Sequence, residues 1–294
     1  MRVTVTGAGG FIGSHVVRAL ELRGDTVEAW SRAAVDVTDA GAVGDALSRG
    51  APDVVIHLAA QSLPARSWLD PVGTYRINVD GAINVLEAAR ALPRPPRLLL
   101  AGSSAEYAEP ADGSRIAEDA PLEPNSPYAS SKLAVDELAR MYGRRYGLEI
   151  VRFRPFFLVG PGKAGDVCSD FARRIVAIER GAEATMRVGD LSAVRDMIDV
   201  RDGVAAVMRL IDAGAPGNVY NICGGHGVRI GDVLETLRGL ATVPVTVAVD
   251  PALLRPLEQK VKIGDPGRLR ALGWAPEYQL DETLRAILEH ARAL

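Results

Sequence analysis

The sequence predicts an α/β fold in which a doubly wound parallel sheet is followed by a smaller C-terminal α/β unit. Strand-like apolar runs alternate with helix-like amphipathic runs over the first half of the chain. Such alternation is typical of a parallel sheet with helices on both faces. The rhythm changes near residue 156, where shorter and less regular elements begin. We therefore expect a first domain over residues 1–155, with later return segments near 195–223, and a second domain formed mainly by residues 156–294.

The strands of the first domain are predicted from short runs rich in β-branched and other apolar residues, with glycine, proline or polar residues at their ends. These runs are residues 2–7, 26–30, 53–60, 97–104 and 149–155. Helices are predicted between them because apolar residues recur every three to four positions. The helical runs are residues 11–24, 40–50, 74–92 and 126–147.

The C-terminal part has weaker signals. The glycine-rich segment 160–166 predicts a loop, and residues 170–181 predict an amphipathic helix. Residues 216–225 predict a late strand that could return to the main sheet. The helical pattern of 227–241 and a final helix after residue 280 complete the second domain.

The composition favours a globular protein with a small-molecule partner. The chain has 294 residues, of which 48% are hydrophobic and 24% charged, so it can bury a sizeable core. A net charge of −3 and short basic clusters argue against a nucleic-acid or membrane partner. Cys168 and Cys223 lie far apart without ligand-like neighbours, which favours buried free thiols over a disulfide or a metal site. The start MRVTVTG has no leader-like pattern, so we expect a cytoplasmic location.

The segment TGAGGFIG, residues 6–13, is the first chemical motif, and it sets Gly7, Gly10 and Gly13 between the first strand and the first helix. Glycines allow a tight turn and a close approach to a pyrophosphate, which the helix N-terminus attracts. A merely structural turn is the alternative. The strand–turn–helix context favours a Rossmann-type dinucleotide site.

The end of the second strand indicates which dinucleotide binds. An acid there would hold the ribose hydroxyls of NAD, whereas an arginine would accept the extra phosphate of NADP. The strand runs into Ser31 and Arg32, so the sequence favours NADP(H), with NAD(H) possible. Asp36, with Val37 after it, is a candidate for contact with the adenine edge. A solvated surface charge is the alternative for Arg32, and a structural role such as helix capping is the alternative for an acid in this segment.

A possible acid–base unit lies in SPYASSKLAVDEL, residues 126–138, where Tyr128 precedes Lys132 by one helical turn. The two side chains share a helical face, and a nearby cation is expected to lower the pKa of a phenol. Ser104, at the end of the predicted strand 97–104, would hold a substrate oxygen against the tyrosine. This Y-x-x-x-K spacing also occurs by chance in many helices, but it occurs here together with the glycine turn.

These segments together resemble the extended short-chain dehydrogenase/reductases that act on nucleotide sugars. The resemblance rests on TGAGGFIG, VVIHLAAQS, INVDGAINVLEAA, GSSAEY, SPYASSK and RPFFLVGPG, in that order, over the first 165 residues. Later segments are most similar to reductases of GDP-4-keto-6-deoxy sugars. Those segments are SDFARRIVAIE, VGDLSAVRDMIDVRD, GNVYNICGGHGVRIGDVL and LLRPLEQ.

The resemblance implies an NADPH-dependent reduction of the 4-keto group of a GDP-4-keto-6-deoxyhexose, which gives a product of the GDP-D-rhamnose type. Tyr128 would be the general acid, Ser104 would hold the oxygen and Lys132 would orient the nicotinamide ribose. It also implies a homodimer through the helices that carry INVLEAA and YASSKLAVDEL. The resemblance places further residues at the cofactor, namely Phe11, Ile12, Leu58, Ala59 and Ala60, and others at the nucleotide of the substrate, namely Arg195, Arg255 and Glu258.

Several features leave alternatives open. Phe157 stands where relatives usually have asparagine, so a polar substrate contact is missing. Glu106 could be the catalytic base of a nucleotide-sugar 4,6-dehydratase, and a 4-epimerase with a recycled cofactor is a related alternative. An NADP-sensing protein without activity is a third possibility. Arg195 could form a salt bridge with a neighbouring aspartate, and His57 reads as a structural histidine at the end of an apolar strand.

Overall fold

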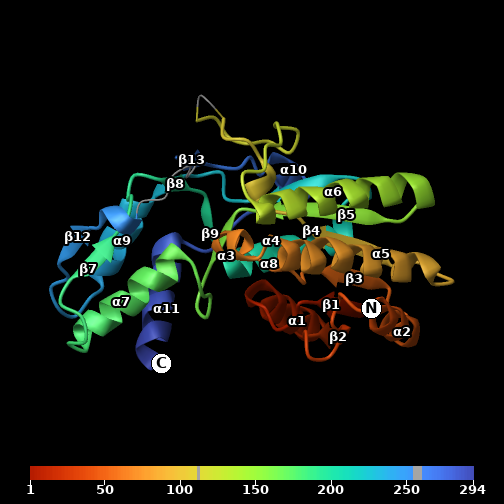
Figure 1. Ribbon diagram of the computed structural model, residues 1–294, viewed down its shortest axis with the longest axis horizontal. Coiled ribbons are helices and arrows are strands. Elements are labelled where there is room, and N and C mark those ends of the chain that lie inside the picture. Colours follow the sequence, from red (N-terminus) through yellow and green to blue (C-terminus); the bar gives the residue numbers. More distant parts are fainter. Residues whose placement is uncertain (111–112, 254–259) are drawn as a thin grey trace.

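The computed structural model describes residues 1–110, 113–253 and 260–294. Its main sheet has six parallel strands in the order β10-β5-β4-β3-β1-β2 (Figure 1). This arrangement confirms the predicted α/β fold class. The strands are β1 (Arg2–Thr6), β2 (Thr26–Trp30), β3 (Val54–His57), β4 (Arg97–Ala101), β5 (Ile150–Pro155) and β10 (Val219–Ile222).

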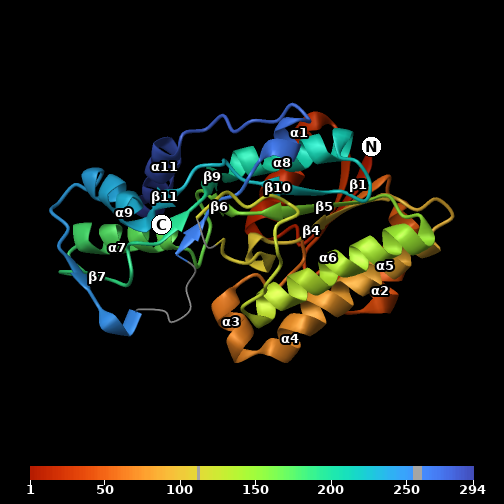
Figure 2. The same ribbon diagram turned by 90° about the horizontal axis from the view of Figure 1, so that it is seen from above.

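Helices cover both faces of this sheet, as Figure 2 shows. On one face, α1 (Phe11–Arg23) packs beside α8 (Val200–Ala213). On the other face lie α2 (Ala40–Gly50), α5 (Gly81–Ala91) and α6 (Pro127–Tyr146). Alternate residues of β4 point to opposite faces, so Leu99 belongs to the first core and Leu98 and Leu100 to the second.

The order of the strands sets where a ligand can bind. Strand β2 extends the sheet on one side of β1, while β3, β4, β5 and β10 extend it on the other. The order therefore reverses between β1 and β3, and ligands of such sheets bind beyond the carboxyl ends of the strands at this point. The late strand β10 returns to the sheet beside β5, as the sequence predicted.

Several predicted elements are shorter or more divided than expected. Strand β3 ends at His57 and β4 at Ala101, and a short 3-10 turn, η2 (Ser104–Glu106), follows β4. The predicted helix 74–92 is divided into the end of α4, a π-helical turn and α5. The short elements around it are α3 (Pro64–Leu69), α4 (Pro71–Tyr75) and the π-helical η1 (Arg76–Asp80).

The C-terminal part has its own apolar core, which α7 (Val167–Glu179), α9 (Ile230–Gly239) and α11 (Leu280–Ala293) share. The described residues also form three small sheets outside the main sheet. No described helix has the length and apolarity that a membrane crossing needs. The remaining elements are β6 (Phe157–Val159), β7 (Met186–Val188), β8 (Val194–Arg195), β9 (Met197–Asp199), β11 (Val228–Arg229), β12 (Val247–Val249), η3 (Pro251–Leu253), β13 (Val261–Lys262) and α10 (Gly267–Arg270).

Candidate active site

The turn between β1 and α1 has the shape that a pyrophosphate requires. Gly7 has a φ of 70°, and a Cβ on it would lie 2.7 Å from the backbone nitrogen of Ala59. A Cβ on Gly13 would clash with the Gly7 carbonyl oxygen. Helix α1 follows Gly10, and no side chain caps its first N–H groups, which face the carboxyl end of the sheet. The turn thus fits a dinucleotide and brings together the predicted residues Gly7, Gly10, Phe11, Ile12 and Gly13.

The end of β2 lies beside this turn, because a Cβ on Gly9 would be 3.8 Å from the Ser31 Cβ. The Arg32 side chain is 80% exposed, and its Nε lies 3.5 Å from a carboxylate oxygen of Asp36. Hydrogen bonds from the backbone and side chain of Thr38 hold the pKa of Asp36 below its usual value, and Arg32 adds to this effect. The side chain of Val37 is buried in the core under α5, and the cofactor contact expected of this residue stays a prediction.

The segment after β3 is fixed to β1 by one threonine. The Thr6 hydroxyl accepts hydrogen bonds from the N–H groups of Leu58 and Ala59, both at 3.2 Å. It also lies within hydrogen-bond distance of Nδ1 of His57, at 2.8 Å. Burial and, to a lesser degree, the charge of Lys132 together lower the pKa of His57 to about 3, so the ring is neutral. His57 is therefore a buried, hydrogen-bonded residue, as the sequence suggested. Ala60 follows Leu58 and Ala59 in the segment that lies beside the glycine turn.

Helix α6 carries Tyr128 and Lys132 on one face at its N-terminal end. Ser126 caps the helix by accepting a hydrogen bond from the Ala129 N–H. The Lys132 ammonium donates to the carbonyl oxygen of Ala101 at the end of β4, at 2.8 Å. Both side chains are nearly buried, with 9% of Tyr128 and 6% of Lys132 exposed. The helix thus presents the pair at the carboxyl edge of the sheet, beside β4.

The pKa of the phenol differs from the expectation that Lys132 lowers it. Burial, opposed by a hydrogen bond with Ser103 and assisted by the charge of Glu106, raises the pKa of Tyr128 to about 12. Burial lowers the pKa of Lys132 to about 8. Desolvation dominates at Tyr128 because little of its side chain is exposed to water. The phenol is therefore protonated at neutral pH, which is the form that a proton donor needs.

The serine that contacts the phenol is Ser103. Its side chain makes the hydrogen bond to Tyr128, and its Oγ also accepts from the Ala105 N–H at 3.1 Å. Ser104, which the sequence suggested, is 6% exposed, and its carbonyl accepts a hydrogen bond from Nζ of Lys262 at 2.8 Å. The difference arises because β4 ends at Ala101 and the chain then enters the 3-10 turn η2, which changes the direction of each side chain.

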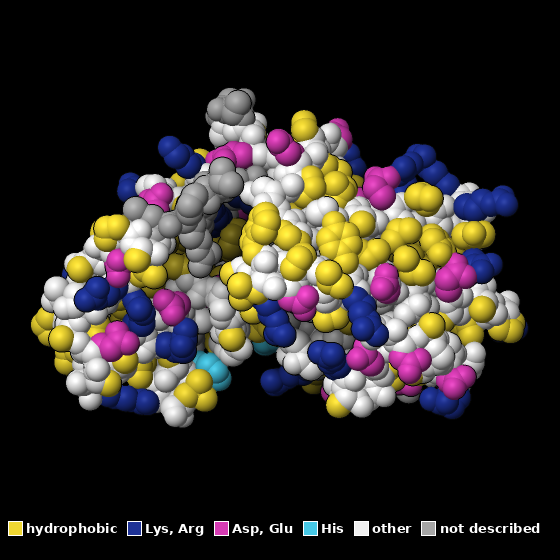
Figure 3. All heavy atoms as spheres, in the orientation of Figure 1, with side chains coloured by type: hydrophobic (Ala, Val, Ile, Leu, Met, Phe, Trp, Pro, Cys, Tyr) yellow, Lys and Arg dark blue, Asp and Glu magenta, His cyan; other side chains and the backbone are white. Residues whose placement is uncertain are grey.

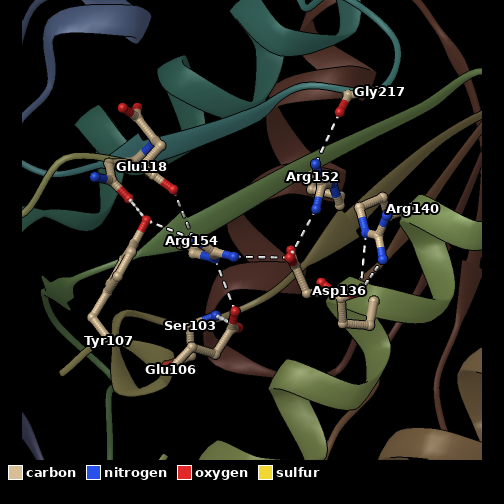
Figure 4. A network of polar contacts seen from close by, with 11 residues as sticks. Ser103, Glu106, Tyr107, Glu118, Asp136, Arg140, Arg152, Arg154 and Gly217 are labelled. Atoms are coloured by element: carbon tan, nitrogen blue, oxygen red, sulfur yellow. Dashed lines mark hydrogen bonds and ion pairs between the residues drawn. The ribbon is translucent and has the colours of Figure 1, made fainter. Parts of the chain in front are cut away.

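Glu106 is fully buried and belongs to a network of charges (Figure 4). One carboxylate oxygen accepts the Ser103 N–H at 2.6 Å, and the other lies 2.8 Å from Nε of Arg154. Burial raises the pKa of Glu106, and the Arg154 cation opposes the rise. Both oxygens are therefore engaged within the protein, whereas the sequence suggested a contact with substrate or a role as base.

Arg195 lies on β8 with 5% of its surface exposed, and its guanidinium is 5.7 Å from the ring centre of Phe157. The two carboxylates considered as its salt-bridge partners have other contacts. Asp196 accepts three backbone N–H groups, from Gly224, Gly225 and Gly264, and Asp199 pairs with Arg201. Arg255 and Glu258, predicted at the nucleotide end, lie outside the described residues.

Sequence reasoning missed several residues that the structure brings to this site. Ser103 contacts the phenol, and Arg154 and Lys262 hold the turn that carries it. Asn78 is 1% exposed on η1 and joins Gln61 after β3 to Ser131 on α6, with bonds of 2.7 and 2.8 Å. A buried polar residue within an apolar strand or helix, such as Arg154 in VRFRP, is the signal that could have found them.

The site lies where the two parts of the molecule meet, and Figure 3 shows a recess in that surface. Lys262 of β13 reaches from the C-terminal part to the carbonyl of Ser104 in the turn η2. Arg195 is the register partner of Lys262 across the β8–β13 pair. The glycine turn and the Tyr128–Lys132 helix belong to the first part, and Arg195 to the second. The arrangement can hold a dinucleotide on one side and an anionic substrate on the other.

Comparison with known proteins supports this description. The model of the NAD dependent epimerase/dehydratase family matches residues 3–223. A GDP-6-deoxy-D-mannose reductase of Pseudomonas aeruginosa is 35% identical over 98% of this chain and 96% of its own length. The structure of RMD from Pseudomonas aeruginosa complexed with NADPH has a TM-score of 0.92 and 34% identity over 99% of both chains. A UDP-glucose 4-epimerase of Thermus thermophilus in complex with NAD has a TM-score of 0.90 and 32% identity, again over 99% of both chains.

Proposed function

The chain belongs to the NAD dependent epimerase/dehydratase family, and we propose that within this family it is a reductase of a nucleotide sugar. The substrate we propose is a GDP-4-keto-6-deoxyhexose, reduced at carbon 4 to a product of the GDP-D-rhamnose type. The 35% identity with a GDP-6-deoxy-D-mannose reductase over nearly the whole chain supports this choice. The enzyme is an NAD(P)-dependent nucleotide-sugar oxidoreductase or epimerase of the extended short-chain type, and the reduction is the specific activity we infer.

The observation that carries the proposal is the hydrogen bond between the Tyr128 phenol and the Ser103 hydroxyl, one helical turn from Lys132. A ketone that accepts hydride becomes an alkoxide, which needs a proton and a donor to hold its oxygen. Tyr128 delivers that proton, and Ser103 holds the oxygen. Lys132 lies one turn along the helix, where it binds the ribose of the cofactor. Bound NADPH supplies the hydride.

The state of Glu106 favours the reductase over a 4,6-dehydratase. A dehydratase needs a free carboxylate to remove the proton at carbon 5 of the sugar. Glu106 has no exposed surface and engages both oxygens, with the Ser103 N–H and with Arg154. A reductase makes no such demand, so a structural Glu106 fits its chemistry.

The cofactor we propose is NADP(H). Arg32 is exposed at the end of β2, next to the glycine turn, and it carries the only charge there that suits a 2′-phosphate among the described residues of that segment. Its partner Asp36 is held by Thr38 and lies on the same turn. A structure related to this chain contains NADPH, while another contains NAD, so the preference is an inference from Arg32.

For the nucleotide end we propose that Arg195 binds a phosphate of the substrate. A guanidinium suits phosphate because it offers several donors in one plane. Phe157, which replaces an expected asparagine, lies against this guanidinium and orients it by a cation–π contact. The aromatic ring thus supports a phosphate contact in place of making a polar contact itself.

The decisive experiment is incubation of the purified protein with NADPH and GDP-4-keto-6-deoxy-D-mannose. We expect one equivalent of NADPH to be oxidised for each sugar reduced, and no loss of water from GDP-mannose. Formation of a 4-keto sugar from GDP-mannose without added cofactor would show a dehydratase. Interconversion of UDP-hexose epimers without net cofactor oxidation would show a 4-epimerase.

We also propose a homodimer through α5 and α6, which pack side by side along one face of the sheet. Apolar side chains are exposed on α6, where Met141 is 56% and Tyr146 48% exposed. Light scattering should give twice the chain mass, and Met141→Lys should shift the protein to monomers. A monomer at all concentrations would remove this proposal.

A further inference from the structure

Arg154 lies on β5, in the middle of the protein, with 2% of its surface exposed. Each of its three guanidinium nitrogens has a partner. Nε lies 2.8 Å from Glu106, and Nη2 donates to Asp136 at 2.8 Å. Nη1 donates to the Tyr107 hydroxyl at 2.8 Å and to the Glu118 carbonyl at 3.3 Å. Figure 4 shows the guanidinium between the two carboxylates.

On one side, this arginine reaches the turn that carries Ser103. The Glu106 carboxylate that pairs with Arg154 also accepts the Ser103 N–H, at 2.6 Å. The Ser103 hydroxyl in turn accepts the Ala105 N–H, which completes a capping box over η2. The orientation of the Ser103 hydroxyl toward Tyr128 therefore depends on where Arg154 holds Glu106.

On the other side, the same arginine reaches the helix that carries the tyrosine and the lysine. Asp136 is four residues after Lys132 and eight after Tyr128 on α6, so all three lie on one helical face. Asp136 is 3% exposed, and the carboxylate oxygen that Arg154 contacts lies 2.8 Å from the nitrogen. Arg154 thus contacts both elements that build the proposed catalytic site. It acts on Tyr128 and Ser103 only through other residues.

We propose that Arg154 is a positioning residue that fixes the Ser103 turn and the Tyr128–Lys132 helix relative to each other, through Glu106 on one side and Asp136 on the other. The inference rests on the proposed function in one respect only, because it takes Ser103, Tyr128 and Lys132 as the catalytic group. Lysine cannot replace this arginine, since one ammonium cannot span two carboxylates with a planar set of donors.

The Arg154–Glu106 pair can be followed by pH titration, because several charged groups surround Glu106. Arg154 approaches it from β5, Asp136 and Lys132 from α6, and Lys262 from β13. Tyr107 follows Glu106 in the chain and bonds to Arg154. The charge of Glu106 raises the pKa of Tyr128 and also that of Lys132. A change in the Arg154–Glu106 pair should therefore move the pH dependence of turnover, which a general loss of stability would not do.

Arg152 offers a matched control. It lies on the same strand and donates to the same oxygen of Asp136, also at 2.8 Å, and its other contact is the carbonyl of Gly217 at 2.9 Å. The network thus contains two buried arginines with one shared partner, of which Arg154 also pairs with Glu106. Arg152→Lys changes the helix contact, whereas Arg154→Lys changes the helix contact and the link to the serine turn.

The test compares these two variants in the NADPH-dependent reduction of GDP-4-keto-6-deoxy-D-mannose. We expect Arg154→Lys to lower kcat by about tenfold to a hundredfold, the scale for a small misplacement of catalytic groups, with a Kd for NADPH within about twofold of the parent. Arg152→Lys should lower kcat by less than about threefold. A double-mutant cycle should show that the effect of Arg154→Lys becomes much smaller in the Glu106→Ala background.

A second pair of variants keeps the test valid if Arg154→Lys does not fold. Glu106→Gln retains an oxygen that can accept the Ser103 N–H, whereas Glu106→Ala does not, so turnover should fall much less in Glu106→Gln. The phenolate titration of Tyr128, measured as the ultraviolet difference between each variant and its Tyr128→Phe form, should move to lower pH in Glu106→Gln. This readout needs no substrate.

The role of Arg154 would be overturned if Arg154→Lys and Arg152→Lys lost the same factor in kcat. It would also be overturned if the factors lost in kcat by Arg154→Lys and by Glu106→Ala simply multiplied in the double variant. Equal turnover of Glu106→Gln and Glu106→Ala would overturn it too. If Tyr128→Phe abolishes turnover in that same experiment, the proposed function stands and only the positioning role fails. If Tyr128→Phe keeps full turnover, the catalytic assignment itself fails.

Discussion

The two ends of the candidate cofactor site are built in different ways. At the chemical end, Ser103, Tyr128 and Lys132 are each less than 10% exposed, and they are linked to buried groups such as the Ala101 carbonyl and the Glu106 carboxylate. At the adenosine end, Arg32 is 80% exposed and has a single carboxylate partner at 3.5 Å. Buried polar networks depend on all of their members, whereas an exposed ion pair is weak and easily replaced.

This difference indicates which properties of the enzyme are fixed and which can change. In the proposed mechanism the geometry for proton transfer depends on contacts between β4, β5, α6 and β13, so single changes there should have large effects. In our proposal the choice between NADP and NAD depends on one exposed turn after β2, so changes there should have small and separable effects. The predictions below test this contrast, beginning with the largest expected effect.

Tyr128→Phe should lower turnover by at least about a hundredfold, because it removes the proton donor and retains the ring. The hydroxyl is its only polar group, and its hydrogen bond is to Ser103. Binding of NADPH, followed by fluorescence titration, should be retained. Tyr142→Phe is a suitable control, since Tyr142 lies near the C-terminal end of α6 and its hydroxyl donates to Glu87 of α5. Turnover near that of the parent in Tyr128→Phe would exclude the phenol from the mechanism.

Lys132 should make the stability of the protein depend on pH. Its pKa is about 8 in the folded protein, against about 10.4 for an unfolded lysine. Between these values the unfolded chain binds more protons, so the free energy of unfolding rises with pH. From pH 8 to 9.5 the parent should gain on the order of 2 kcal/mol relative to Lys132→Met.

Urea unfolding at the two pH values measures this difference. Contributions from Lys262 and Tyr128 occur in both proteins and cancel. Lys260→Met, which replaces an exposed lysine, should have the same change in free energy of unfolding between the two pH values as the parent. A difference in free energy of unfolding between the parent and Lys132→Met that stays constant across this range would contradict the desolvation of the ammonium that the structure indicates.

Ser103→Ala should lower turnover by about tenfold or more, because it removes the donor that holds the substrate oxygen. Ser104→Ala is the matched control, since the contact of Ser104 to Lys262 uses its carbonyl, which alanine retains. Ser103→Thr should restore most of the activity. If Ser104→Ala were the more damaging change, the sequence-based choice of serine would be right and the contact of Ser103 would be structural.

The serine illustrates what the sequence could and could not predict. The glycine turn, the Tyr128–Lys132 spacing and the alternation of strands and helices are local patterns, and the structure has all of them. Which of two adjacent serines faces the tyrosine depends on β4 ending at Ala101, a boundary set by pairing with neighbouring strands. Local patterns do not contain that information.

The charges of the site show the same limit. A lysine one turn from a tyrosine predicts a lowered phenol pKa, but burial by distant segments raises it instead. The pairing of Arg154 with Glu106 joins β5 to the turn after β4, and the sequence shows only a charge within an apolar strand. Contacts between elements decide both properties, so they follow from the fold and not from spacing along the chain.

Arg32→Ala should weaken the binding of NADPH by about tenfold and that of NADH by less than about twofold, because only NADPH carries the phosphate that the guanidinium would meet. The exposure of Arg32 keeps the effect modest, since water and salt screen the interaction. Calorimetry with each cofactor at low and high salt measures it. Equal effects on both cofactors would identify Arg32 as a surface charge.

The smallest effect should be on stability at the same exposed end. Asp36→Asn removes the carboxylate that pairs with Arg32 at 3.5 Å, and a pair of this kind is worth less than about 1 kcal/mol. The amide can still accept the hydrogen bonds from the backbone and side chain of Thr38, so the turn should keep its shape. We therefore expect the free energy of unfolding at neutral pH to fall by about 0.5 kcal/mol or less, with the loss disappearing at high salt.

Asp136→Asn, which removes a buried charge shared by two arginines, should destabilise the protein several times more. Comparable losses in the two variants would mean that the adenosine end is as tightly built as the chemical end, and the contrast between them would not hold.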